Sequence, residues 1–214
     1  MGERDNRKPE WWFYPGWVVL SAISMPIALA IAWAIMSQVV NAIGDTIQVQ
    51  GQTHITEDFL FIFIVLPVLG LVAGLLQYVL LRRYLPRMAW WIAAAFLGWL
   101  LLSAVLGIAT LFSVAVHPAV FILLIGGSAG LAQWLVLRRR VRRAALWILA
   151  SVLGWGMPFL PHGAIASQPG MLSVVLLPAI VASIAWWLLL GKLPRRESSG
   201  DNAPRSTSMP LGAH

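Results

Sequence analysis

Two glutamines are the most conspicuous polar side chains in the long apolar runs of this chain. Gln77 and Gln133 close two copies of the pattern G-x-x-x-G-x-x-Q. A carboxamide in hydrocarbon needs a hydrogen-bond partner, so both could bond between helices. They could instead line a path for a small neutral solute, together with the hydroxyl groups of Ser103, Thr110, Ser113 and Ser151. The apolar runs contain no Asp, Glu, Lys, Arg or His, whereas coupled transporters usually do, which favours bonding between helices.

Three histidines lie in the loops at one side of the predicted helices. His54 has Glu57 and Asp58 nearby, and His117 and His162 each stand alone. Neutral imidazoles bind zinc and copper, so three converging histidines could form a metal-binding sensor on the outer face. The sequence shows no local spacing of metal ligands, and we expect neither a metal nor another cofactor.

Arginines dominate two loops on the opposite side. Such residues bind anionic headgroups at roughly 1 kcal/mol each near the surface, and they also determine topology. An acidic segment of a membrane-protein partner is a further candidate. The net charge is +7, but the basic residues lie beside apolar runs, so a nucleic-acid partner is not expected. The arginines of the two loops are Arg82, Arg83 and Arg87, then Arg138, Arg139, Arg140, Arg142 and Arg143.

Groups for catalysis are missing from the same runs. They contain no acid–base pair. The absence of cysteine excludes disulfides and thiolate chemistry. We therefore expect a non-catalytic protein.

The elements that must position these residues are membrane helices. The 214 residues are 59% hydrophobic and 11% charged, against about 45–50% and about 25% in soluble domains. The sequence predicts an all-α integral membrane protein with a six-helix domain over residues 17–191, between a cytoplasmic tail (1–16) and a disordered cytoplasmic tail (192–214). The predicted spans cover residues 17–40, 59–81, 89–112, 119–137, 144–160 and 171–190.

The distribution of basic residues predicts the orientation. All 15 Lys and Arg residues lie in the two tails or in the loops after the second and fourth spans. By the positive-inside rule, both termini are then cytoplasmic. Residues 46–56 alternate between apolar and polar around Gly51, which predicts a short β-hairpin on the outer side.

An internal repeat relates two of the predicted helical hairpins. Residues 70–99 and 126–155 align without a gap at an offset of 56, with 16 of 30 positions identical. Small residues spaced along a helix let a second backbone approach closely. The predicted packing seam comprises Gly70, Gly74, Gln77 and Gly98 in the first copy and Gly126, Gly130, Gln133 and Gly154 in the second.

The repeat also carries two pairs of tryptophans. Trp91 and Trp147 are expected at the cytoplasmic interface, and Trp99 and Trp155 lie eight residues further, about 12 Å deeper. The deeper pair and the two glutamines are therefore the residues most expected to border a cavity. Residues 16–22 resemble 98–104, so the sixth and first spans could form a degenerate third hairpin with pseudo-three-fold symmetry.

The combined pattern GxxQ[YW], then LRR, W and GW, resembles repeats in multi-pass proteins of bacterial membranes that have no assigned activity. The resemblance covers roughly residues 66–157 and implies a bacterial inner-membrane location. The prediction is therefore a structural, assembly or ligand- and lipid-binding membrane protein. The alternatives are a small-solute or lipid transporter that uses the seam between hairpins, and the outer-face metal sensor.

Overall fold

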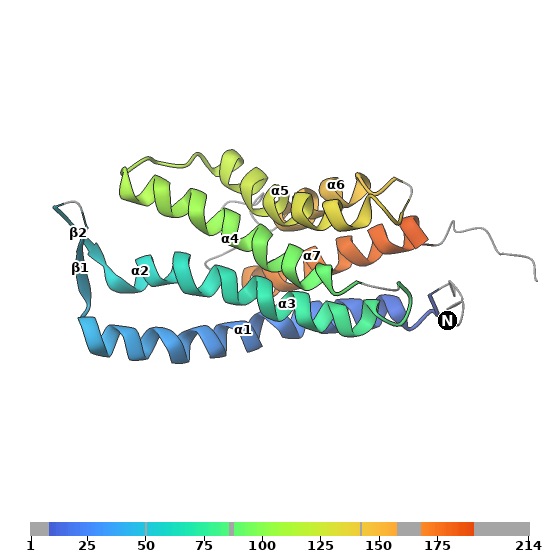
Figure 1. Cartoon of the computed structure of the whole chain (residues 1–214), viewed down its shortest axis with the longest axis horizontal. Coiled ribbons are helices and arrows are strands. Elements are labelled where there is room, and N and C mark those ends of the chain that lie inside the picture. The colour runs from blue at the N-terminus through green and yellow to red at the C-terminus, as the bar shows by residue number, and fades with distance from the viewer. Residues whose placement is uncertain (1–8, 50, 86–87, 142, 158–167, 191–214) are drawn as a thin grey trace, which may run out of the picture.

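The computed structural model describes residues 9–49, 51–85, 88–141, 143–157 and 168–190, and these are mostly helical (Figure 1). A two-stranded antiparallel sheet is the one departure from helix among the described elements. The elements in chain order are α1 (Phe13–Ile43), β1 (Thr46–Val49), β2 (Gln52–Ile55), α2 (Thr56–Leu60), a π-helix η1 (Phe61–Val65), α3 (Leu66–Leu81), α4 (Trp90–Leu111), α5 (Pro118–Leu137), α6 (Leu146–Gly156) and α7 (Gln168–Leu190).

Five helical segments are long and apolar enough to cross a membrane. They are Phe13–Ile43, Thr56–Leu81, Trp90–Leu111, Ala119–Leu137 and Ser173–Leu190. This confirms the predicted class of a helical, multi-pass membrane protein. The predicted fifth span, 144–160, contains the apolar helix α6 with 11 residues. At 1.5 Å per residue α6 is about 17 Å long, less than the roughly 30 Å of hydrocarbon.

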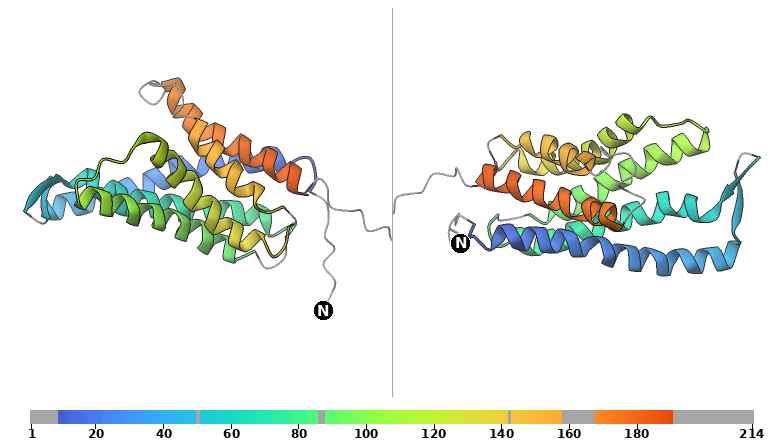
Figure 2. Two further views of the ribbon diagram at one scale, coloured as in Figure 1. Left: turned by 90° about the horizontal axis from the view of Figure 1, so that it is seen from above. Right: turned by 180° about the vertical axis from the view of Figure 1, so that it is seen from behind.

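The long helices form a closed ring. Around the ring, α1 packs against α3, α3 against α4, α4 against α5, α5 against α6, and α6 against α7. Helix α7 packs against α1 and closes the ring. The sheet and the α4–α5 connection lie at one end of the ring (Figure 1). The first described residues and the α3–α4 and α5–α6 connections lie at the other, as the reverse view in Figure 2 also shows. The arginine-rich connections therefore share one end of the molecule.

The short sheet confirms the predicted hairpin at residues 46–56. Strands β1 and β2 pair antiparallel, with Thr46 opposite Ile55 and Val49 opposite Gln52. Gly51 in the turn has a φ of 79°, a left-handed conformation that suits glycine.

Glycines of the repeat allow close contact within each hairpin. A Cβ on Gly70 of α3 would lie 2.9 Å from the Ala95 carbonyl oxygen of α4. A Cβ on Gly126 of α5 would lie 2.7 Å from the Ser151 carbonyl oxygen of α6. Ala95 and Ser151 are themselves 56 residues apart, so the two hairpins pack in the same register. A Cβ on Gly74 would lie 2.9 Å from the Ala95 Cβ, and a Cβ on Gly130 would lie 2.8 Å from the Ser151 Cβ.

Two further glycines form the contacts between hairpins. A Cβ on Gly98 of α4 would lie 2.8 Å from the Cα of Ala129 in α5. A Cβ on Gly154 of α6 would lie 3.0 Å from the Cα of Pro178 in α7. The six glycines predicted in the packing seam thus all lie at close helix contacts.

The first helix begins earlier than predicted. Residues 13–16 belong to α1, not to the tail. The reason is burial: Phe13 is fully buried, with its ring 5.0 Å from Tyr84 and 6.1 Å from Trp186. An aromatic side chain that packs inside the ring extends the helix beyond the apolar run that predicted it.

The π-helix η1 reflects the proline that follows it. Pro67 cannot donate a hydrogen bond to the preceding turn, which disturbs helical pairing there. The Ile62 carbonyl accepts a 2.8 Å hydrogen bond from Ser103 Oγ of α4. Ser103 therefore bonds between helices, as the favoured interpretation of the polar residues predicts, and it does not border the central cavity described below.

Candidate functional site

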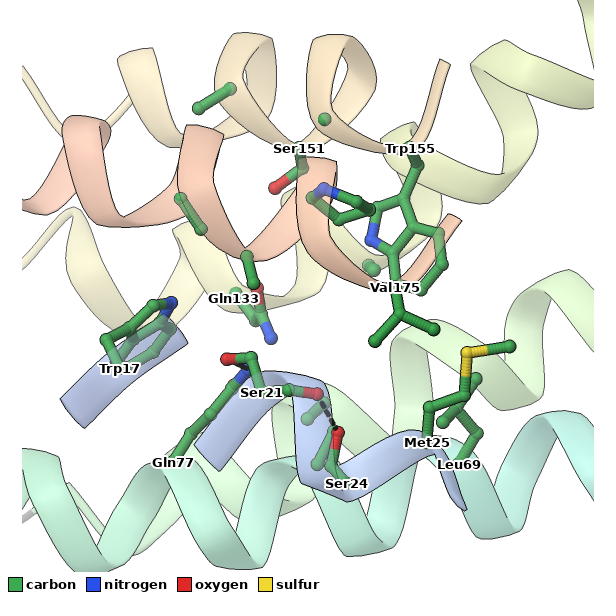
Figure 3. A pocket seen from close by; sticks show the side chains of 18 of the residues that line it. Trp17, Ser21, Ser24, Met25, Leu69, Gln77, Gln133, Ser151, Trp155 and Val175 are labelled. Carbon is green, nitrogen blue, oxygen red and sulfur yellow. Dashed lines mark hydrogen bonds between the residues drawn. The ribbon is translucent and has the colours of Figure 1, made fainter. Parts of the chain in front are cut away.

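A cavity of about 80 Å³ lies inside the helix ring (Figure 3). Every helix of the ring contributes to its wall. The wall includes Trp17, Ser21, Ser24 and Met25 of α1, Leu69, Ala73 and Gln77 of α3, Ala95 and Trp99 of α4, Ala129 and Gln133 of α5, Trp147, Ala150, Ser151, Gly154 and Trp155 of α6, and Val174, Val175, Pro178, Ala179 and Ala182 of α7. All four residues that the sequence associates with a cavity, Gln77, Gln133, Trp99 and Trp155, are among them.

Each glutamine accepts a hydrogen bond from a tryptophan of its own hairpin. Trp91 Nε1 donates to Gln77 Oε1 at 3.0 Å, and Trp147 Nε1 donates to Gln133 Oε1 at 2.7 Å. Both pairs are separated by 14 residues, so the repeat preserves the bond. Gln77 Nε2 also donates to Ser21 Oγ of α1 at 3.2 Å. The two carboxamides point toward one another from opposite sides of the cavity (Figure 3).

Trp91 and Trp147, which the sequence places at the cytoplasmic interface, do not face outward as residues of an aromatic belt would. Both face the inside of the ring and are 0% and 3% exposed. They form a near-equilateral triangle with Trp17, at centroid distances of 6.1, 5.9 and 5.6 Å. Trp186 packs against all three at 4.9–5.9 Å. This tryptophan cluster borders the cavity on the side of the arginine-rich connections.

The triangle also corrects the alignment of the first helix. Residues 16–22 resemble 98–104, which would put Trp17 at the depth of Trp99. Trp17 instead lies beside Trp91 and Trp147. Counting four residues on from each of these tryptophans gives Ser21, Ala95 and Ser151, all of which line the cavity. The local likeness of the letters is therefore out of register with the packing by eight residues.

The deeper tryptophans lie on the other side of the cavity. Trp99 and Trp155 make a T-shaped contact at 5.0 Å, and Trp99 is 4% exposed. Edge-to-face contact is a favoured arrangement of two aromatic rings. The cavity therefore has aromatic walls along the ring axis in both directions.

Polar groups of the wall are uncharged. The described wall contains no Asp, Glu, Lys, Arg or His. Ser24 Oγ donates to the Ser21 carbonyl at 2.6 Å, and Ser151 Oγ donates to the Trp147 carbonyl at 2.8 Å, so these hydroxyl protons are occupied by their own helices. The wall's donors that have no acceptor among the described residues include Trp17 Nε1, which is buried, and Gln133 Nε2. The site suits a neutral molecule that accepts hydrogen bonds.

The remaining hydroxyls of the predicted solute path lie elsewhere. Thr110 Oγ1 donates to the Leu106 carbonyl of its own helix at 2.9 Å. Ser113 follows the end of α4 with a φ of 52°. Neither residue borders the central cavity.

The described arginines of the two loops are exposed. The Arg83 guanidinium lies 5.5 Å from the Trp12 ring, and that of Arg138 lies 5.2 Å from Trp134, both cation–π contacts. Burial raises the pKa of the nearby Tyr84, and the Glu10 carboxylate raises it further, so this phenol stays neutral. Arg82, Arg139, Arg140 and Arg143 are also exposed, and Arg87 and Arg142 lie outside the described residues.

The histidines do not form a metal site within the described part of the chain. No three His, Asp or Glu side chains gather there. His54 lies on β2 and His117 caps α5, where its Nδ1 accepts from the Ala119 amide at 3.3 Å. His162 lies outside the described residues.

Comparison with known protein families, curated proteins and solved structures finds no match to this chain. The cavity is therefore the feature of this chain that bears on function. Sequence reasoning missed the contributions of α1 and α7, above all Trp17 and Ala182. The constant separation of 14 residues between glutamine and tryptophan was the available signal for the hydrogen-bonded pairs.

Proposed function

We propose that this chain is a non-catalytic protein of a bacterial inner membrane that binds a small, neutral, polar ligand inside its helix ring. The observation that carries the proposal is the cavity inside the ring, whose uncharged wall presents two carboxamides and an indole N–H without a partner among the described residues. A volume of about 80 Å³ corresponds to roughly two or three waters at about 30 Å³ each. The ligand is thus compact.

The topology that goes with this function has six spans and both termini in the cytoplasm. Support comes from the exposed arginines at one end of the ring and from the positive-inside rule. The sixth span would be α6 continued by the apolar residues that follow it in the sequence. The glycine contacts at an offset of 56 support tandem hairpins, and the tryptophan triangle supports α7–α1 as a third, degenerate unit.

The arginine-rich end would bind anionic lipid headgroups. Exposed guanidinium groups beside apolar helices attract such lipids electrostatically, and those of Arg83 and Arg138 lie against interfacial tryptophans. This contact would hold the ring at a fixed depth in the bilayer. An acidic segment of a membrane-protein partner would compete for the same surface.

The second candidate is passage of the ligand through the ring. The observation that favours it is the position of the cavity, which every helix of the ring lines. Against it, the tryptophan cluster fills the ring on one side of the cavity. Transport would require these four indoles to move apart.

Replacing both glutamines tests the proposal and separates it from passage. The Gln77→Leu/Gln133→Leu variant and the wild type are placed in nanodiscs, and small neutral solutes are screened by the rise in unfolding temperature. The proposal expects saturable stabilisation of the wild type and none of the variant. If no solute stabilises the wild type, the binding function is refuted. Flux of the same solute into proteoliposomes, abolished in the variant, would instead establish passage.

A further inference from the structure

The α7–α1 pair has an alanine at the position where the other two helix pairs carry a glutamine. Ala129 and Pro178 are equivalent positions, because Gly98 and Gly154 approach their Cα atoms in the same way. Four residues beyond Ala129 is Gln133. Four residues beyond Pro178 is Ala182, which also lines the cavity.

A second contact supports this register. Ser183 Oγ donates to the Tyr14 carbonyl at 3.2 Å, which fixes α7 against the turn of α1 that precedes Trp17. In the other two pairs the glutamine bonds the tryptophan of the returning helix. Ala182 therefore stands where a carboxamide would bond Trp17.

Trp17 is left without an acceptor as a result. Its side chain is 1% exposed, and Nε1 has no hydrogen-bond partner among the described residues. The nitrogen lies on the side of the indole ring nearer Gln133 (Figure 3). A buried N–H without an acceptor costs free energy, so the position calls for an acceptor that the described residues do not supply.

Two other groups beside this position have spare hydrogen-bonding capacity. Gln133 uses Oε1 for Trp147, and its Nε2 bonds no described residue. Pro178 has no N–H, so the Val174 carbonyl four residues earlier lacks its usual helical donor. Val174 and Pro178 both line the cavity. The site therefore offers two donors and one acceptor.

We propose that a small primary amide, such as urea or acetamide, occupies the place of the missing carboxamide in front of Ala182. Its carbonyl oxygen accepts from Trp17 Nε1 and Gln133 Nε2, and its NH₂ group donates to the Val174 carbonyl. An amide fits because the acceptor for the other two tryptophans is itself a carboxamide oxygen. Charged ligands are disfavoured because the wall carries no opposite charge. The inference rests on the proposed ligand-binding function and names its ligand class.

Indole N–H resonances of the full chain in nanodiscs report binding directly. The chain is labelled with ¹⁵N-tryptophan, and Trp17→Phe identifies the Trp17 signal. Titration with acetamide or urea is expected to move this signal downfield and to saturate, while exposed Trp90 stays unchanged. Trp17 also makes an 87° edge contact with Trp147. An upfield Trp17 signal that amides leave unchanged would show that its N–H points at an aromatic face, and would overturn the inference.

The Ala182→Gln variant supplies the missing carboxamide within the chain. We expect its Trp17 signal to lie downfield without ligand and its affinity for acetamide to fall about tenfold or more. Ala182→Met fills the same space without an acceptor, so it should lose affinity and leave the Trp17 signal unmoved. Ile184→Ala, on the exposed face of the same helix, should bind as the wild type does. Unchanged affinity in Ala182→Gln would contradict the proposed position.

Control solutes distinguish a failure of the amide inference from a failure of the proposed ligand-binding function. If ethanol or glycerol moves the Trp17 signal saturably and amides do not, the amide inference fails and ligand binding in the cavity stands. If neither amides nor alcohols move the Trp17 signal, and no solute stabilises the wild type, the amide inference and the ligand-binding function both fail. Saturation by amides alone supports both.

Discussion

Neighbouring glycines of α5 offer a matched test of the packing account. A Cβ on Gly126 would lie 2.7 Å from the Ser151 carbonyl oxygen, closer than real Cβ atoms approach other groups. A Cβ on Gly127 would have no atom within 4 Å. Gly126→Ala therefore forces α5 and α6 apart, and overpacking of this kind costs about 1–3 kcal/mol. Gly127→Ala should be neutral or should stabilise by up to about 1 kcal/mol, because alanine favours the helix.

The free energy of unfolding can be measured in mixed micelles with a rising fraction of sodium dodecyl sulfate. The 12 tryptophans provide the fluorescence signal. Gly126→Ala should unfold at a lower detergent fraction than the wild type, and Gly127→Ala at the same or a higher one. Equal destabilisation by the two changes would refute the close contact between α5 and α6.

The remaining predictions address hydrogen bonding, topology and lipid contact. Gln133→Leu should lower the unfolding free energy by about 0.6–2 kcal/mol, and Gln77→Leu by more because it loses two bonds; the same unfolding assay measures both. The chain has no cysteine, so Thr53→Cys in intact cells should react with a membrane-impermeant maleimide and Arg139→Cys should not; the reverse pattern would invert the topology. Arg83→Gln/Arg139→Gln should weaken co-purification of anionic lipid, measured by mass spectrometry, and unchanged lipid content would count against headgroup binding.

Periodic apolar runs and turn chemistry predicted much of the architecture. The spans near 59–81, 89–112 and 119–137 match the observed helices closely, because lipid-exposed helices are apolar along their whole length. The glycines of the repeat predicted the close contacts between helices, because a second backbone can approach a helix this closely only where a side chain is missing. The π-helix was not predictable from its own residues, because it depends on Pro67 and on a hydroxyl from α4.

The site was less accessible to sequence reasoning. Tryptophans near helix ends usually mark the interface, so the constant separation of 14 residues from a glutamine was the one signal that Trp91 and Trp147 turn inward. The likeness of residues 16–22 to 98–104 did not predict the position of Trp17, because similarity over seven residues does not fix how far a helix is shifted along its neighbours. Ala182 by itself predicts no site, because only the glutamines at equivalent positions show that a carboxamide is missing there.

The most direct test of ligand binding is equilibrium dialysis of a labelled small amide against the full chain in nanodiscs. The account predicts saturable binding of one molecule per chain in the wild type. Ala182→Phe, which fills the cavity in front of Trp17, should bind none. Equal binding by the two proteins, or none by either, would contradict a ligand site inside the ring.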